Sequence, residues 1–293
     1  MYVHDFVATL DQMATLTDRP FAVNIPLYRP QVSDIIDVMV ARQVPVVIAS
    51  QGGPKAHLPR FRAYGAKWIQ VVSTLEHALK AEAAGVDALI VVGTEAGGHP
   101  PANEVSTLVT VRQVLREVSV PVIAGGGVAD GWGIAALLAL GADGVQLGTR
   151  FLMTHEATVH EAYKNAVLKA GAADAVLVGR RSLPVRTLNN EFAKSIFNAE
   201  QRDVSAEEYE TLFKKSSLKQ AALNGDVVDT PIPLTNLSYA TSNLSGKAGL
   251  DYRLSDDVLA YATFSRGYRS PSFNAQAFFA PAEAGSAGSE TIN

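Results

Sequence analysis

Short apolar runs alternate with amphipathic segments in the first half of the chain. The runs start near Phe21, Val44, Lys67, Ala88, Pro121 and Gly144 and consist mostly of Val, Ile, Ala and Leu. Such runs are typical of strands in a parallel sheet that helices cover on both faces. Between them, apolar residues at helical spacing predict helices over 6–16, 35–42, 58–64, 74–84, 108–118 and 131–140. The alternation predicts an α/β fold.

Polar and glycine residues mark where several of these helices begin and end. Ser73 and Glu76 have the S-x-x-E spacing of a capping box, and Gly85 stands where a helix commonly ends. Asp130 is placed to cap the helix over 131–140, and Gly141 to end it. A helix-to-strand joint recurs at 65–67, 85–87 and 141–143, where glycine precedes an apolar residue and then Lys or Asp. The repeated joint indicates one repeating architecture.

Glycine-rich loops follow three of the predicted strands. They are Gly93-Thr94-Glu95-Ala96-Gly97-Gly98-His99, Gly125-Gly126-Gly127 and Gly148-Thr149. Because glycine lets backbone N–H groups approach a ligand, two neighbouring loops of this kind form a phosphate cradle. A pair of loops at the last two strands favours a (β/α)8 barrel, and no G-x-G-x-x-G motif of a doubly wound fold is present. We predict an α/β fold of the (β/α)8 TIM-barrel type, incomplete, with six of eight strands.

The pattern changes after residue 150. Helices are expected over 155–170 and 206–223, with a less regular segment up to residue 190. Strict alternation over 247–254 and 258–265, with a turn at 255–257, predicts a β-hairpin. The last dozen residues are rich in Ala, Gly, Ser and Glu, and we expect them to be disordered. The chain thus divides into a barrel-type domain, residues 1–229, and a hairpin-like tail, residues 230–293.

Composition excludes several classes of protein. The 25 basic and 29 acidic residues give a net charge of −4 without a basic cluster, which argues against a nucleic-acid partner or an anionic membrane surface. The absence of cysteine excludes disulfides, thiolate metal sites and a cysteine nucleophile. We recognise no signal peptide and no apolar run that could span a membrane, so a cytoplasmic protein is expected. The six histidines lack metal-ligand spacing, and no metal site is expected.

The loop 93–99, with the segments 121–130 and 144–152, resembles the nitronate monooxygenase family, formerly called 2-nitropropane dioxygenases. This family includes FMN-dependent enoyl-acyl carrier protein reductases. Weaker similarity continues through 163–164 and 190–193, and the resemblance covers roughly residues 17–226. It implies an FMN-binding (β/α)8 barrel that oxidises an anionic alkyl nitronate: the substrate gives an electron to FMN, and O2 completes the oxidation.

The resemblance also implies roles for individual residues. The residues expected to hold the FMN phosphate are Gly126, Gly127, Gly148 and Thr149, and those expected to contact the flavin are Asn24, Ala96, Gly97 and Gly98. His99 matches the active-site histidine of the family. A neutral imidazole there removes the α-proton of a nitroalkane or orients the nitro oxygens, and a structural histidine is the alternative. We interpret Glu95 as a carboxylate that fixes the loop, with an acid catalyst as the alternative.

Two features depart from the family pattern. The family opens with a strand carrying Gln-x-Pro-Met, a helix and a second strand, and we expect this chain to begin after them, as an N-terminally truncated member. The C-terminal segment of about 55 residues resembles the late strands of a TonB-dependent outer-membrane receptor. Nitronate oxidation is therefore weighed against an inactive truncated fusion product, a phosphate-binding isomerase and an FMN- and NADH-dependent enoyl reductase. Open sheet edges also favour an oligomer.

Overall fold

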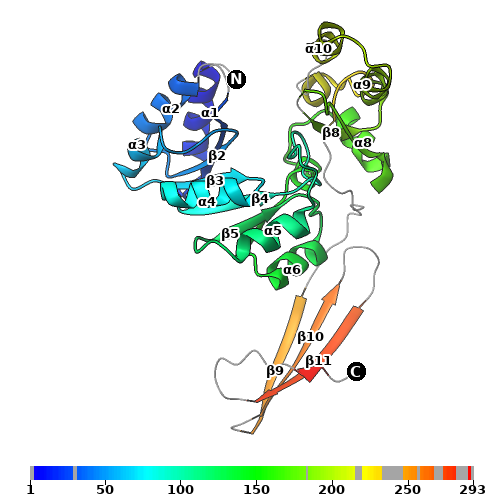
Figure 1. Cartoon of the computed structure of the whole chain (residues 1–293). Helices are drawn as coiled ribbons and strands as arrows, with labels where there is room; N and C mark the ends of the chain where they lie inside the picture. The colour runs from blue at the N-terminus through cyan, green and yellow to red at the C-terminus, as the bar shows by residue number, and fades with distance from the viewer. Residues whose placement is uncertain are drawn as a thin grey trace. The chain divides into compact units, whose positions relative to one another are not determined.

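The computed structural model of the chain describes residues 3–28, 32–182, 184–214, 220–232, 247–255, 258–266, 273–281 and 290–291. The chain forms two compact units, Met1–Leu237 and Ser238–Asn293. In the first unit helices pack against a curled parallel sheet, and the second unit contains an antiparallel sheet (Figure 1).

Six parallel strands form the main sheet, in the order β1-β2-β3-β4-β5-β6. They are β1 (Ala22–Pro26), β2 (Val46–Ser50), β3 (Lys67–Val72), β4 (Ala88–Val92), β5 (Val122–Gly125) and β6 (Gly144–Gln146). Each begins within two residues of its predicted start. The sheet curls into half of a barrel (Figure 1), which confirms the predicted incomplete TIM-barrel type. Because neighbouring strands are parallel, their carboxyl ends meet at one edge.

Six helices accompany these strands. They are α1 (Val3–Leu16), α2 (Val32–Ala41), α3 (Leu58–Arg62), α4 (Leu75–Ala84), α5 (Thr107–Leu115) and α6 (Gly131–Leu140). As predicted, the Asp130 side chain caps α6, and Gly141 ends it in the left-handed conformation. The predicted capping box placed the N-cap of α4 at Ser73, one residue too early. Thr74 caps α4 instead, because its hydroxyl accepts a hydrogen bond from the N–H of His77.

A continuous apolar core holds the sheet and its helices together. Trp68, Phe61, Ile36, Met39 and Leu89 are among its largest fully buried side chains. The rings of Phe61 in α3 and Trp68 in β3 meet edge to face, with centroids 5.4 Å apart. Four of the five residues of β4 are buried, as expected for a strand covered on both faces.

The repeated helix-to-strand joint places equivalent aspartates between neighbouring strands. Asp87 precedes β4 and accepts a hydrogen bond from the N–H of Trp68 in β3 at 2.9 Å. Asp143 precedes β6 and accepts one from the N–H of Val122 in β5 at 2.8 Å. In these two joints the aspartate therefore links the strand that follows it to the preceding strand of the sheet.

The segment after β6 corrects two sequence-based expectations. Instead of one helix over 155–170, α7 (Thr149–Leu152) and α8 (Glu161–Lys169) flank a non-helical stretch. The Nδ1 atom of His160 accepts a hydrogen bond from the N–H of Ala162, so α8 begins only there. The supposedly less regular segment contains a 3₁₀ turn, η1 (Ala172–Asp174), and the antiparallel strands β7 (Ala175–Val178) and β8 (Val185–Leu188). Strands of four residues are too short for alternation to reveal them.

Helical elements complete the described part of the first unit. They are α9 (Glu191–Gln201), α10 (Ala206–Lys214) and a π-helical turn, η2 (Gln220–Asn224). The helix α9 was not predicted, although Asn190 caps it by accepting a hydrogen bond from the N–H of Ala193. A single helix was expected over 206–223; α10 lies within this range, η2 is a π-helical turn that ends one residue beyond it, and residues 215–219 are outside the described part.

The second unit is an antiparallel sheet in the order β12-β11-β10-β9. Its strands are β9 (Lys247–Ser255), β10 (Val258–Arg266), β11 (Phe273–Pro281) and β12 (Glu290–Thr291). The pairing of β9 with β10 confirms the predicted hairpin, although turn residues 256 and 257 lie outside the described part. The strand β11 was not predicted. The expected disorder of the last dozen residues was wrong for Glu290 and Thr291, because they pair with β11.

Candidate functional site

A cavity of about 1220 Å³ lies at the carboxyl ends of the strands, and we call it the strand-end cavity. Loop residues 50–56 line it, together with Gln70 to Ser73 from the end of β3 and with His77 and Lys80 from α4. The predicted site residues that line it are Asn24, Ala96, Gly97, His99, Gly126 and Gly148. Residues from all six strands or the loops that follow them thus reach one cavity.

The glycine loops after β5 and β6 lie side by side. Gly125 pairs with Gln146 in the parallel register, so Gly126 and Gly148 both follow strand ends at the same edge of the sheet. Gly126 has a φ of +107°, and a Cβ there would lie 2.8 Å from Oγ1 of Thr107. A Cβ at Gly148 would meet nothing within 4 Å. Gly148 therefore leaves its backbone open to a ligand, whereas Gly126 lines the cavity and permits the close approach of Thr107 and Ala96.

The remaining predicted residues lie next to the cavity without lining it. Gly127 follows Gly126 in the same loop with a φ of +75°, and Thr149 is buried at the first position of α7. Gly98 has a φ of +76°, and its carbonyl oxygen accepts a hydrogen bond from the N–H of Arg186. Each of these three residues is adjacent in the chain to a residue that lines the cavity.

The turn that carries His99 is anchored to the start of α5. The Glu95 carboxylate accepts hydrogen bonds from the N–H of Thr107 at 2.7 Å and from its hydroxyl at 2.8 Å. The interpretation of Glu95 as a carboxylate that fixes the loop is therefore confirmed. A side chain at Gly93 would collide with the backbone of Thr107, so the close approach of turn and helix requires glycine there.

The His99 ring is held by a backbone carbonyl from a distant part of the chain. Its Nδ1 atom lies 2.9 Å from the carbonyl oxygen of Pro184. A carbonyl can only accept, so Nδ1 carries the proton and Nε2 is left with a lone pair in the neutral ring. His99 can therefore accept a proton through Nε2, and afterwards donate a hydrogen bond from it.

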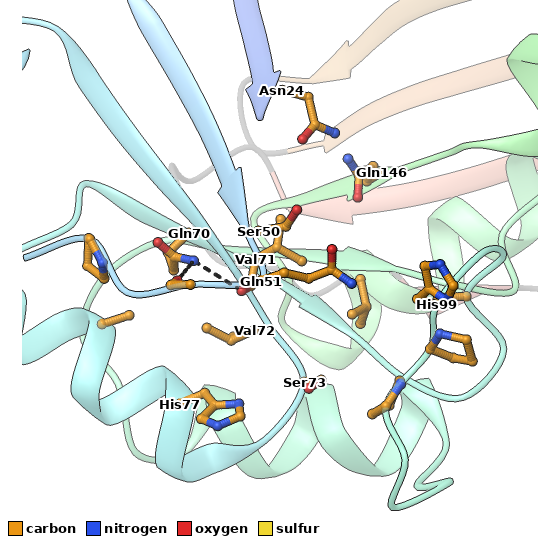
Figure 2. Close-up of a pocket in the computed structure, with 18 of the residues that line it drawn as sticks. Asn24, Ser50, Gln51, Gln70, Val71, Val72, Ser73, His77, His99 and Gln146 are labelled. Atoms are coloured by element: carbon orange, nitrogen blue, oxygen red, sulfur yellow. Dashed lines mark hydrogen bonds between the residues drawn. The ribbon is translucent and has the colours of Figure 1, made fainter. Parts of the chain in front are cut away.

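Gln70 fixes the opposite wall of the cavity. It is 3% exposed and lies in β3 between the apolar residues Ile69 and Val71. Its amide donates to the carbonyl oxygens of Ala49 and Gly52, both at 3.0 Å, and its Oε1 accepts from the Trp68 indole at 3.1 Å. Figure 2 shows the bond to Gly52, together with a longer one, 3.4 Å, from the same amide to the carbonyl oxygen of Val71. A polar residue between apolar neighbours in a strand was the sequence signal for this role.

Two amide side chains at opposite edges of the sheet remain available to a ligand. Asn24 lies in β1 and Gln146 ends β6, and both line the cavity (Figure 2). Within the described part of the chain, neither side chain has a hydrogen-bond partner. Each can offer one acceptor and two donor hydrogens to a bound molecule. The sequence analysis named Asn24 and missed Gln146.

Charged groups are confined to one side of the cavity. Lys55, His77 and Lys80 line it, and Lys80 forms an exposed ion pair with Glu76. The hydrogen bond from Lys80 holds the pKa of the Glu76 carboxyl below its ordinary value. No group of three potential metal ligands occurs among the described residues. Within the same ranges, no helix is both long and apolar enough to cross a bilayer.

The parallel half-barrel, with glycine loops at its strand ends, has the architecture of an incomplete (β/α)8 barrel. Residues 31–240 match the sequence model of the nitronate monooxygenase family, and the chain belongs to this family of oxidoreductases. Residues 213–292 match a second family, described as a TonB dependent receptor-like beta-barrel.

Curated relatives include two kinds of enzyme. The chain is 37% identical over 191 residues to (3aS,4S,5R,7aS)-5-hydroxy-7a-methyl-1-oxo-octahydro-1H-indene-4-carboxyl-CoA dehydrogenase of Rhodococcus jostii. This alignment covers 64% of this chain and 53% of that protein. It is 34% identical over 201 residues to a probable nitronate monooxygenase of Staphylococcus aureus, and this alignment covers 65% of this chain and 56% of the Staphylococcus protein. The chain thus spans about half the length of the curated relatives it matches.

Two solved structures also resemble the chain. FabK from Thermotoga maritima aligns with a TM-score of 0.75 and 38% identity over 80% of this chain and 74% of its own. Nitroalkane oxidase from Streptomyces ansochromogenes aligns with a TM-score of 0.67 and 27% identity over 80% of this chain and 79% of its own.

Proposed function

We propose that the chain binds FMN in the strand-end cavity and oxidises alkyl nitronates with O2. The observation that carries this proposal is the convergence of Gly126, Gly148 and His99 on one cavity. Backbone amides at two neighbouring strand ends suit a phosphate, as in other barrels of this class. The histidine lines the same cavity from the loop after β4, within reach of a substrate bound beside the cofactor.

The residues at the two strand ends fit a flavin mononucleotide. We assign its phosphate to the backbone of Gly126, Gly127, Gly148 and Thr149, because the open space at Gly148 leaves room for it. We assign the flavin ring to residues 96–98 and to the unpartnered amide of Asn24. When bound, FMN supplies an electron acceptor that O2 can reoxidise.

His99 would act on the substrate through Nε2. The contact of Nδ1 with Pro184 keeps Nε2 unprotonated in the neutral ring, as a proton acceptor requires. Nε2 can take the α-proton of a neutral nitroalkane, and the imidazolium so formed can hold the nitro oxygens of the resulting nitronate. A substrate that arrives as a nitronate needs only the second role, and for this role His99 has to carry a proton on Nε2 before the substrate binds.

A second candidate function is an NADH-linked enoyl reduction in the same cavity. The similarity to FabK, with 38% identity and a TM-score of 0.75, favours it. The two activities differ in the electron donor, which is the nitronate itself in one and NADH in the other. Turnover of each substrate by the same preparation distinguishes them.

The test uses the full chain, mixed with FMN and separated from the free cofactor by gel filtration. We expect yellow protein that consumes O2 when an alkyl nitronate is added. The variant His99→Gln should keep the colour and, with a neutral nitroalkane as the substrate, lose about 100-fold or more in kcat, the size of a general-base contribution. His77→Gln is the matched control, because His77 lines the same cavity from α4.

Each other outcome contradicts a stated part of the proposal. Loss of colour in His99→Gln would make His99 a structural residue. NADH oxidation with an enoyl thioester, without nitronate turnover, would select the reductase. Folded protein that retains no flavin would select the inactive fusion product.

A further inference from the structure

The start of β8 runs beside the turn that carries His99. The N–H of Arg186 donates to the carbonyl oxygen of Gly98 at 2.8 Å, and these two residues form a single antiparallel bridge. In this register the next pair, His99 with Val185, is a non-hydrogen-bonded one, and the next hydrogen-bonded pair would be Pro100 with Pro184, where proline has no N–H to donate. The ladder therefore stops, and the Pro184 carbonyl accepts its hydrogen bond from the His99 ring instead.

The Arg186 side chain reaches the other end of the same turn. Its Nε donates to the carbonyl oxygen of Thr94 at 2.7 Å, and its Nη2 lies 3.4 Å from the Thr94 hydroxyl. Its Nη1 donates to the carbonyl oxygen of Ala175 at 3.3 Å. Arg186 thus holds the turn at Gly98 through its backbone and at Thr94 through its guanidinium.

The guanidinium remains charged in this half-buried place. Burial lowers the pKa of Arg186, while the nearby carboxylates of Glu95 and Glu104 act in the opposite direction. An arginine does not lose its proton under such conditions. Its bonds to the Thr94 carbonyl are charge-assisted and therefore stronger than those between neutral groups.

We infer that Arg186 is a positioning residue for His99. By fixing both ends of the turn 94–98, it keeps the imidazole against Pro184, with the proton on Nδ1 and the lone pair on Nε2. The inference rests on the proposed function in one respect, namely that Nε2 is the atom that meets the substrate. Without the guanidinium only single hydrogen bonds join β8 to the turn, and the ring becomes free to exchange tautomers.

The tautomer can be measured on the full chain without a cofactor. Nitrogen NMR of protein labelled with 15N-histidine distinguishes protonated from unprotonated ring nitrogens, and the signals missing in His99→Gln identify His99. In the unmodified chain we expect a protonated Nδ1 and an unprotonated Nε2. In Arg186→Met the two His99 shifts should move towards each other, because the tautomers average.

Arg181→Met is the matched control for the loss of a guanidinium. Arg181 contacts Asp203, Val204 and Tyr209 and makes no contact with the turn, so its replacement should leave the His99 signals unchanged. Arg186→Lys can still donate to Thr94 and should restore part of the separation between the two shifts. Unchanged His99 signals in folded Arg186→Met would overturn the inference. If that variant does not fold, Arg186→Lys decides alone, and signals identical to the unmodified chain refute it.

Kinetics provide a second measurement if nitronate turnover is found. We expect Arg186→Met to lower kcat about tenfold or more with little change in KM, because the variant misplaces a reacting group rather than a binding surface. An equal kcat in both proteins would contradict the inference. A chain that binds no flavin but shows the predicted tautomer change would refute the proposed function and leave the positioning role of Arg186 intact.

Discussion

The Nδ1 atom of His99 lies 2.9 Å from the carbonyl oxygen of Pro184, although 85 positions separate the two residues in the chain. This contact joins the loop after β4 to the β7–β8 pair and decides which ring nitrogen carries the proton. The site therefore depends on residues outside the main sheet as well as on the strand ends.

Replacing Gly126 by alanine should weaken flavin binding and destabilise the chain. The residue has a φ of +107°, and a Cβ would lie 2.8 Å from the Thr107 hydroxyl and 3.0 Å from the N of Ala96. Strain of this kind costs about 1–3 kcal/mol. Urea unfolding and quenching of FMN fluorescence measure the two effects. Gly53→Ala is the control, because Gly53 also lines the cavity and a Cβ there meets nothing within 4 Å. Equal behaviour of the two variants would refute the proposed cradle.

Replacing Glu95 by glutamine should loosen the turn that carries His99. The carboxylate accepts two hydrogen bonds from Thr107, and a neutral amide accepts them more weakly. We expect a loss of about 1 kcal/mol in the free energy of unfolding. We also expect faster hydrogen exchange of the amide of Thr107. Glu117→Gln, at an exposed position two residues after the end of α5, should change neither quantity. Unaltered exchange in Glu95→Gln would show that the carboxylate does not anchor the turn.

Replacing Gln70 by methionine should disturb the wall of the cavity opposite His99. The variant leaves the Trp68 indole N–H and the carbonyl oxygens of Ala49 and Gly52 without their partner. Unsatisfied buried polar groups of this kind cost about 1–3 kcal/mol each. Thermal unfolding measures the loss, and Gln113→Met on the exposed face of α5 is the control. A variant as stable as the unmodified chain would mean that the loop after β2 is held by other contacts.

Asp87 should contribute stability that depends on pH. Burial alone raises the pKa of its carboxyl, but hydrogen bonds from the Trp68 N–H and from Lys67 outweigh burial and lower it below the ordinary value of 3.8. A lowered pKa in the folded chain means that the stabilisation is complete above the ordinary value. It disappears as the pH falls further, through the lowered pKa.

The variant Asp87→Asn should accordingly lose about 1–2 kcal/mol at neutral pH. The difference from the unmodified chain should shrink in urea titrations below pH 3.8, the ordinary aspartate value. Glu76→Gln, which removes an exposed ion pair with Lys80, is the control and should cause little change. A difference between Asp87→Asn and the unmodified chain that stays constant with pH would show that the charge of Asp87 is not involved.

Local patterns in the sequence determined the six strands of the main sheet and most of the helices that accompany them. Runs such as 88–92 are apolar throughout, and residues such as Asp130 and Gly141 act on the helix to which they belong. These signals depend on neighbours in the chain, so they can be read without the fold. The order of the glycine loops after successive strands also predicted that Gly126 and Gly148 lie at one edge, because adjacent parallel strands end together.

Only the tertiary structure decided how His99 is held. The strands β7 and β8 are too short for periodicity to reveal them, and the pairing of Arg186 with Gly98 joins segments far apart in the chain. The same holds for Gln70, whose partners come from the neighbouring strand and the loop after it. These hydrogen bonds join segments that are far apart in the chain and that come together only when the chain folds. Composition and local spacing therefore cannot reveal them.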